Sequence, residues 1–296
     1  MSTLPRAAAY PVALQHAVDG YLADLRFATD PATAGLEEAM RYSLLAPGKR
    51  VRPVLALATG EALGHARDYV MPLAASLELV HTYSLIHDDL PAMDDDELRR
   101  GRPTCHVAYG EDVAILAGDG LFAEAIRLIL DRQPGPPANV MAALRALVAA
   151  VAVEGMVGGQ YFDVTGSGDL DGPALRRLHE LKTGRLIGAS IECVLLLAGS
   201  EPDATLPFRR FAAELGVLFQ IVDDILDVTG DEATLGKPLR SDERHGKSTY
   251  VSVYGLDQAR ELASVSHAKA RDALAEADGS TAALEQITDY ILTRQT

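Results

Sequence analysis

Residues 70–101 read VMPLAASLELVHTYSLIHDDLPAMDDDELRRG, and the fold prediction begins from this stretch. Its first part, residues 70–87, is apolar nearly all round, with Glu78 as its only acid. A helix that is apolar on every side is expected to lie inside the protein. Five aspartates and a glutamate then follow within residues 88–97. The stretch therefore predicts a central helix that ends in a group of carboxylates.

A second helix of the same kind is predicted at residues 215–226, LGVLFQIVDDIL. Asp223 and Asp224 lie within it, and Asp227 follows it directly. Asp223 and Asp227 are four residues apart, so they lie on one helix face and can converge on one ion. The chain is therefore expected to have two buried helices that each carry a carboxylate cluster.

Pro91 explains how the first cluster can also converge. Proline does not continue a helix, so the chain is expected to turn there and to bring Asp94 back toward Asp88. Ionised carboxylates at the end of a buried helix need cations, because their desolvation is costly. Clusters of oxygen ligands are typical of Mg²⁺ sites. A single acidic run is usually a solvated helix face, but two such runs on central apolar helices favour a metal site.

Helical patterns cover most of the chain, and no period-two alternation indicates a strand. Pro31 suits a helix start, Gly64 and Gly199 suit helix ends, and Asp171 suits an N-cap. No linker or fixed repeat divides the chain, so we expect one all-α domain over residues 1–296. The predicted helices span residues 5–28, 32–45, 50–63, 69–90, 112–131, 137–159, 172–199, 207–229, 247–277 and 280–294.

Composition excludes several classes of protein. A net charge of -15 argues against nucleic acid or an anionic membrane as the partner. Two cysteines, Cys105 and Cys193, make no disulfide framework and fit a reducing compartment. The N-terminal residues show no signal-peptide pattern. The most apolar windows, residues 141–155 and 186–199, are too short or carry charges, so no membrane span and a cytoplasmic location are expected.

Short basic clusters outside the acidic runs indicate phosphate binding, because phosphate is held by Arg and Lys. One such cluster is usually a surface loop, but five in a chain with 27 basic residues point to two phosphate groups, one of them without metal. The clusters are GKRVRP with Lys49, Arg50 and Arg52; LRRG with Arg99 and Arg100; LKTG with Lys182 and Thr183; LGKP with Lys237; and HGKST with Lys247.

Taken together, these motifs resemble the trans-prenyltransferases, the isoprenyl diphosphate synthases. DDLPAMDDDELRRG and DDILDVTGD resemble the two aspartate-rich motifs of that family, and GKRVRP, GGQYFD, LKTGRLI, FQIVDDILD and GKSTY follow the family order. The resemblance covers nearly the whole chain and is closest to bacterial farnesyl diphosphate synthases. It implies an isoprenoid-synthase fold, a single-domain helical bundle of about ten or more helices around a central active-site cavity, and a homodimer.

The resemblance also implies roles for individual residues. Three Mg²⁺ ions, with Mn²⁺ as an alternative, would be held by Asp88, Asp94 and Asp223, supported by Asp89 and Asp227. The allylic diphosphate would contact Arg99, Lys182 and Lys237, with Lys247 closing that site. Isopentenyl diphosphate would be held by Lys49, Arg50, His81 and Arg100, with Arg52 in support and Phe219 nearby. Thr183 and Gln220 would line the reacting carbons.

The implied reaction is head-to-tail prenyl transfer from dimethylallyl or geranyl diphosphate to isopentenyl diphosphate. Neutralising the leaving diphosphate allows an allylic cation to form in a dry site, where dipoles of Thr183 and Gln220 stabilise it. Alternatives are a class I terpene cyclase, a non-catalytic subunit and an HD-type phosphohydrolase at His87–Asp89. Cyclases bind one diphosphate and are rich in aromatics, whereas this chain has two basic sets and 5% aromatics.

Product length is predicted to depend on Tyr83 and Ser84. Ser84 lies one helical turn before Asp88, and a turn rises by about 5.4 Å, roughly one isoprene unit. Tyr83 is expected to form the floor of the product tunnel, which favours the fifteen-carbon farnesyl product over a geranyl or geranylgeranyl product.

Overall fold

The computed structural model describes residues 9–166, 170–230 and 247–294. Its helices are α1 (Val12–Asp24), η1 (Pro31–Thr33), α2 (Ala34–Leu44), α3 (Val51–Ala62), α4 (Arg67–Asp88), α5 (Cys105–Tyr109), α6 (Glu111–Arg132), α7 (Pro137–Val151), α8 (Met156–Thr165), α9 (Gly172–His179), η2 (Glu180–Gly184), α10 (Arg185–Ala198), α11 (Pro202–Thr229), α14 (Tyr250–Tyr254), α15 (Leu256–Ala275) and α16 (Ala282–Thr293). The predicted all-α class is confirmed.

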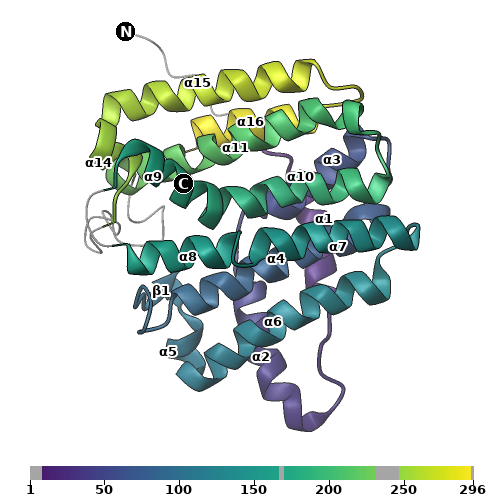
Figure 1. The fold of residues 1–296 in the computed structure, drawn as a ribbon. Coiled ribbons are helices and arrows are strands. Elements are labelled where there is room, and N and C mark those ends of the chain that lie inside the picture. Colours follow the sequence, from purple (N-terminus) through teal and green to yellow (C-terminus); the bar gives the residue numbers. More distant parts are fainter. Residues whose placement is uncertain (1–8, 167–169, 231–246, 295–296) are drawn as a thin grey trace.

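Helix α4 lies in the interior, as its apolar sequence predicts. Every residue from Val70 to Val80 is buried, and the helix packs against α1, α2, α3, α6 and α10. In Figure 1, α15 and α11 lie on one side of the molecule, α6 and α2 lie on the other, and α4 and α10 run between them. The carboxylates at the end of α4 are therefore carried by a helix whose first half is anchored in the core.

Helix α11 is the second central helix, and it packs against α10, α15 and α16. It starts at Pro202 instead of residue 207, because Pro207 is accommodated inside its first turns. Its C-terminal half buries Phe219, Val222 and Leu226. The second carboxylate cluster is thus presented from the core as well.

The predicted helix over residues 137–159 is wrong, because the structure breaks it into α7 and α8. Ala152 is extended at the end of α7, and Gly155 begins the next turn. A Cβ at Gly155 would lie 2.1 Å from the Ala150 carbonyl oxygen, and one at Gly158 would lie 1.7 Å from the Val153 oxygen. Only glycine permits this close backbone approach.

Three further boundaries differ from the prediction. Residues 172–199 are helical throughout, but η2 is a π-helical turn in which the Arg185 amide donates to the Glu180 carbonyl. Gly255, with φ 81°, separates α14 from α15 within the predicted 247–277 helix. A short antiparallel pair, β1 (Leu98–Arg99) with β2 (Arg102–Pro103), follows the acidic loop although no strand was predicted.

One helical stretch, Pro137–Thr165, is long and apolar enough to cross a membrane by length and composition, with a mean hydropathy of 1.9 in its most apolar window. Core helices pass the same test, and 39% of that window is buried inside this fold. The break between α7 and α8 falls within the stretch. We therefore interpret it as two packed helices.

Candidate active site

A cavity of about 620 Å³ opens between the C-terminal end of α4, α8, η2 and the C-terminal half of α11. Acidic, basic, aromatic and aliphatic side chains all contribute to its lining. Its lining includes Arg52, His81, Tyr83, Ser84, Asp88, Arg99, Arg100, Met156, Val157, Gln160, Tyr161, Val164, Lys182, Thr183, Phe219, Asp223 and Arg294. Eleven of the residues predicted from the sequence therefore share one cavity.

The loop after α4 turns at Pro91 as predicted. The Asp94 amide donates to the Asp88 carbonyl at 2.9 Å, and Asp95 adopts a left-handed conformation with φ 52°. Burial raises the pKa of the Asp88 carboxyl to about 6, and the nearby Asp94 adds to the shift while Lys182 opposes it. Asp88 thus faces the cavity as a carboxylate that lacks a sufficient cation.

Asp89 has a different environment. It is 3% exposed and accepts from the Arg99 Nε at 2.6 Å. Burial raises the pKa of the Asp89 carboxyl, although Arg99 opposes the shift. Asp89 does not line the cavity, but it binds the Arg99 side chain, which does.

On the opposite wall, α11 contributes Asp223, which contacts the Arg294 guanidinium. Arg294 also stacks over the Phe219 ring at 4.4 Å and donates to the Phe219 carbonyl. Asp227 lies one turn further on and is 5% exposed. One aspartate from each acidic cluster, Asp88 and Asp223, thus lines the same cavity.

Two lysines approach the acidic end. Lys182 in η2 donates to Asp163 at 2.5 Å, and Lys247 donates to Asp94 at 2.8 Å and lies 3.4 Å from Asp163. Burial alone would raise the pKa of Asp163, but the two lysines outweigh it and lower the pKa. Lys237 lies outside the described residues.

Within the described residues, no group of three or more His, Cys, Asp or Glu side chains is gathered tightly enough to hold a metal ion. The donor set nevertheless fits Mg²⁺, which prefers a few carboxylate oxygens completed by phosphate and water. Burial raises the pKa of the Asp88 carboxyl, so a cation bound beside it would stabilise its ionised form. Asp88, Asp94 and Asp223 are the residues that could hold such ions.

The basic end of the cavity is formed by Arg52, His81 and Arg100. Burial lowers the pKa of Arg52 to about 10 and leaves its Nε without a hydrogen-bond partner. Burial, together with the surrounding arginines, lowers the pKa of His81 well below its usual value. His81 is therefore a neutral imidazole between permanent cations, which suits an anion with several oxygens.

Lys49 and Arg50 do not line the cavity. Lys49 is exposed, with its Nζ 5.3 Å from the centre of the Tyr290 ring. Arg50 is 4% exposed, and its guanidinium is bound by Asp19, Glu78 and the Ala46 carbonyl. The sequence predicted that Arg50 contacts the ligand and that Arg52 only supports it. In the structure Arg52 lines the cavity and Arg50 lies behind it.

Three uncharged polar residues near the cavity come from η2, α8 and α11. Thr183 lies in the π-helical turn, a feature often found at functional sites. Both polar atoms of the Gln160 amide are buried in the cavity wall without hydrogen-bond partners. Gln220 does not appear in the lining, and its Nε2 donates to the buried Asp224 at 2.7 Å.

Tyr83 and Ser84 both line the cavity. The Tyr83 ring packs against Phe122 at 5.2 Å and His87 at 5.8 Å between centroids. The Ser84 hydroxyl donates to the His81 carbonyl. An aromatic wall supported by a second ring therefore lies one turn below the carboxylates.

Four residues of the site were not assigned a role from the sequence: Glu78, Gln160, Asp163 and Arg294. Gln160 and Asp163 lie in the quoted GGQYFD motif, so the motif was a usable signal. Arg294 stands alone in the C-terminal segment DYILTRQT, with no other basic residue near it in the sequence. Its role depends on a contact with Asp223, 71 residues away, which no local pattern shows.

A second cavity, of about 650 Å³, lies between α7, α9, α10 and α11. Its floor consists largely of alanine and glycine. Its charged rim residues pair with one another, as Arg209 does with Glu192 at 2.8 Å and Arg185 with Glu180 at 3.6 Å. The chemically active groups therefore concentrate in the first cavity.

The chain is similar over most of its length to known proteins of one family. The polyprenyl synthetase family model matches residues 33–291. The chain is 44% identical to the farnesyl diphosphate synthase of Escherichia coli K12 over 94% of each chain. It is also 44% identical to the chloroplastic geranylgeranyl pyrophosphate synthase of Capsicum annuum, over 88% of this chain and 71% of that one. A Helicobacter pylori geranyltransferase, solved with magnesium and isoprenyl diphosphate, superposes with a TM-score of 0.83 at 31% identity, over 97% of this chain and 98% of that one.

Proposed function

The chain belongs to the polyprenyl synthetase family, and from this premise we propose that it makes farnesyl diphosphate from isopentenyl diphosphate and the allylic dimethylallyl and geranyl diphosphates. It is a prenyltransferase. The observation that carries the proposal is the division of one cavity into two ends. Asp88 lies among Asp94, Arg99, Lys182 and Lys247, whereas His81 lies among Arg50, Arg52, Arg99 and Arg100. Asp223 lines the same cavity and acts on both Arg294 and Arg52.

The acidic end suits the allylic diphosphate. Asp88, Asp94 and Asp223 would hold Mg²⁺, with Mn²⁺ as an alternative. The family resemblance implies three such ions. The metal, when bound, neutralises the leaving diphosphate. Lys182 and Arg99 supply direct cationic contacts, and Asp89 fixes the direction of Arg99. Lys247, which already contacts Asp94, would close this end.

The basic end suits isopentenyl diphosphate, which would be bound without metal. Arg52 and Arg100 supply permanent charge, and neutral His81 supplies a ring N–H. Lys49, outside the lining, would add charge from the rim. Phe219 and the Arg294 stacked on it cover the adjoining wall.

The residues of the cavity determine how the reaction proceeds. The C1–O bond of the allylic substrate breaks, and its electron pair leaves with diphosphate. The Thr183 dipole and the Gln160 amide oxygen can stabilise the resulting cation without attacking it. The double bond of isopentenyl diphosphate then forms the new C–C bond, and the departing diphosphate takes the proton lost from C2.

Product length follows from Tyr83 and its support by Phe122. We infer that this wall stops the chain at fifteen carbons. A geranylgeranyl synthase is as similar in sequence as the farnesyl synthase, so geranyl and geranylgeranyl diphosphate are the alternative products.

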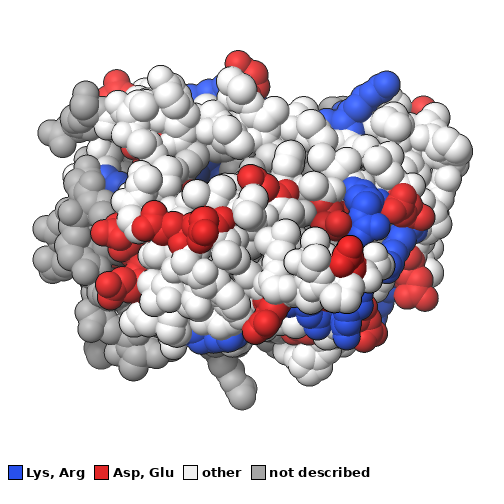
Figure 2. Space-filling model, turned by 90° about the horizontal axis from the view of Figure 1, so that it is seen from below, with Lys and Arg blue, Asp and Glu red and all other residues white. Residues whose placement is uncertain are grey.

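We further infer a single domain over residues 1–296, a cytoplasmic location and a homodimer. Exposed apolar side chains support the dimer. Of the fifteen large ones among the described residues, seven lie within residues 107–153 and outside the active-site cavity: Val107, Ile115, Leu116, Leu130, Met141, Val148 and Val153. Figure 2, viewed from the side of α2 and α6, shows wide uncharged areas between groups of acidic and basic side chains.

One experiment tests the function. Purified protein is incubated with Mg²⁺ and dimethylallyl diphosphate, with and without isopentenyl diphosphate, and the products are identified by mass. A farnesyl synthase releases diphosphate only when both substrates are present and yields a fifteen-carbon product. Diphosphate release from the allylic substrate alone would indicate a cyclase, and no release in either case would indicate a non-catalytic subunit.

A further inference from the structure

Glu78 is a buried acid that the proposed reaction does not use. It is 1% exposed on α4, three residues before His81. An ionised carboxylate in such a place is costly unless it is paired. Its Oε1 accepts from Arg50 Nη1 at 2.7 Å, and both side chains are 2% exposed. Because a buried ion pair contributes little stability compared with apolar packing, this pair calls for another explanation.

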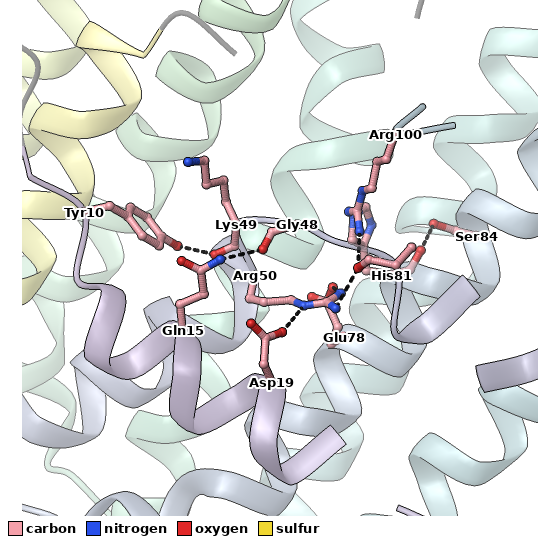
Figure 3. A network of polar contacts seen from close by, with 11 residues as sticks. Tyr10, Gln15, Asp19, Gly48, Lys49, Arg50, Glu78, His81, Ser84 and Arg100 are labelled. Atoms are coloured by element: carbon pink, nitrogen blue, oxygen red, sulfur yellow. Dashed lines mark hydrogen bonds and ion pairs between the residues drawn. The ribbon is translucent and has the colours of Figure 1, made fainter. Parts of the chain in front are cut away.

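Arg50 is the hub of the network shown in Figure 3. Its Nε donates to Asp19 at 2.8 Å, and its Nη2 donates to the Ala46 carbonyl at 2.8 Å. Its backbone is left-handed, with φ 53°. This conformation costs an L-residue about 1–2 kcal/mol and persists only where the surroundings impose it. The Glu78 contact is one of those that fix the guanidinium and hence the turn.

The turn before α3 is held from a second side as well. The Tyr10 hydroxyl donates to the Lys49 carbonyl at 2.7 Å, and Gln15 Nε2 donates to the Gly48 carbonyl at 2.7 Å. Arg52 follows two residues after Arg50 in the first turn of α3. The direction in which Arg52 enters the cavity is therefore set by this turn.

Arg100 is connected to the same network. Its Nη1 donates to the Ala46 carbonyl, at 3.4 Å, so Arg50 and Arg100 share one acceptor. Its guanidinium also lies against Gly48, where a Cβ would be 2.6 Å from Nη1. A shift of Arg50 or of the turn would therefore displace Arg100.

The charge of Glu78 also acts on the cations directly. Burial lowers the pKa of both Arg52 and Arg100, and for each of them Glu78 is the strongest opposing influence. Lys49, Arg50, Arg52 and Arg100 would otherwise repel one another around a mostly buried space. Asp19 is a second acid in the network, but its side chain is 40% exposed.

We propose that Glu78 is a positioning residue for isopentenyl diphosphate: it holds Arg52 and Arg100 in place, through Arg50 and through its own charge, without touching substrate. The inference rests on the proposed function, because it assigns that diphosphate to the basic end of the cavity. It predicts a selective loss of one substrate's affinity and no general loss of catalysis.

The test is steady-state kinetics of Glu78→Gln, which keeps the shape and removes the charge. We expect the KM for isopentenyl diphosphate to rise about tenfold to a hundredfold, the range of a lost charged hydrogen bond. The KM for the allylic substrate and kcat at saturation should change less than about threefold, since the interaction is the same in ground and transition states. Asp19→Asn, at a partly exposed position, should shift the same KM by less.

A double variant separates positioning from stability. Arg50→Met with Glu78→Leu replaces the ion pair by apolar groups of similar volume, a change that proteins often tolerate. We expect thermal stability to be retained and the KM for isopentenyl diphosphate to stay raised. Ser76→Ala is the matched control, because Ser76 is buried on the same helix and bonds only to the Pro72 carbonyl; its KM values should match the wild type.

Several results would overturn the inference. Wild-type KM in a folded Glu78→Gln protein would do so, as would recovery of isopentenyl diphosphate affinity in the double variant. If Glu78→Gln does not fold, Asp19→Asn decides, and an unchanged KM there overturns the inference. A wild-type protein that never consumes isopentenyl diphosphate would refute the proposed function itself, which the wild-type assay detects before any variant is made.

Discussion

Replacing Asp88 by Asn should make the metal-free protein more stable while it removes the activity. Burial raises the pKa of Asp88 from 3.8 to about 6, and the positive charges of Lys182 and Arg99 compensate for it only in part. Ionisation of this carboxyl therefore works against the folded state. The Asn side chain has nearly the same shape and does not ionise.

The magnitude follows from the pKa shift. Two units correspond to about 3 kcal/mol, and the partial exposure of Asp88 reduces this to about 1.5–3 kcal/mol. Because the folded-state pKa is raised, the unfolded chain loses its proton first, and stability falls as pH rises from about 4 to 6. Above pH 6 the full penalty applies, so the Asn variant should then melt about 2–5 °C higher, given the unfolding entropy of a chain of this length.

Differential scanning calorimetry with a chelator present measures the effect at pH 7.5 and pH 4.5. The advantage of Asp88→Asn should fall to about a third at pH 4.5. Asp94→Asn is the control, because Asp94 already pairs with Lys247 at 2.8 Å and should gain nothing. An Asp88→Asn protein that is no more stable than wild type at pH 7.5, or equally favoured at both pH values, would refute the reasoning.

Three further predictions concern the cavity and its surroundings. Tyr83→Ala should yield products of twenty carbons or more by mass analysis, and an unchanged product would show that Tyr83 is not the floor. Lys182→Ala should mainly raise the KM for the allylic substrate and Arg100→Ala that for isopentenyl diphosphate; equal effects on both substrates would contradict the two-ended cavity. Burial lowers the pKa of His179 to about 4, so the neutral imidazole of the folded protein costs nothing above pH 6.5, and the folded protein loses stability as pH falls from 6.5 toward 4. His179→Asn should reduce this loss of stability by about 2–3 kcal/mol, measured by urea unfolding at pH 6.5 and pH 4.

Much of the site could be predicted because its signals are local. The apolar sequence before Asp88 indicates a buried helix whatever surrounds it, and the structure buries every residue from Val70 to Val80. Pro91 requires a turn, and the turn places the Asp94 amide on the Asp88 carbonyl. Such features depend on hydrophobicity and on proline geometry, which a single sequence shows.

The rest could not be predicted because it depends on distant partners. Arg50 and Arg52 stand in one short basic motif, and composition cannot tell which one enters the cavity. The choice is made by Glu78, 28 residues further on, and by Asp19, 31 residues earlier. The break between α7 and α8 likewise depends on backbone contacts of Gly155 that the apolar pattern around it conceals.

The two ends of the cavity share one physical property, which links stability to function. Asp88 and Arg52 are both half-buried. The Asp88 carboxyl has too little positive charge beside it, and the Arg52 Nε has no hydrogen-bond partner. Both costs are borne by the folded protein before any ligand binds, and a diphosphate with its cations would relieve both. Protein stability should therefore increase on ligand binding by more than the count of new contacts suggests. The network around Glu78 differs, because the Arg50 guanidinium already donates to Asp19, Glu78 and the Ala46 carbonyl before any ligand binds. Rigid support behind the basic end, with unpaired charge at its surface, is the arrangement expected of a preorganised anion site.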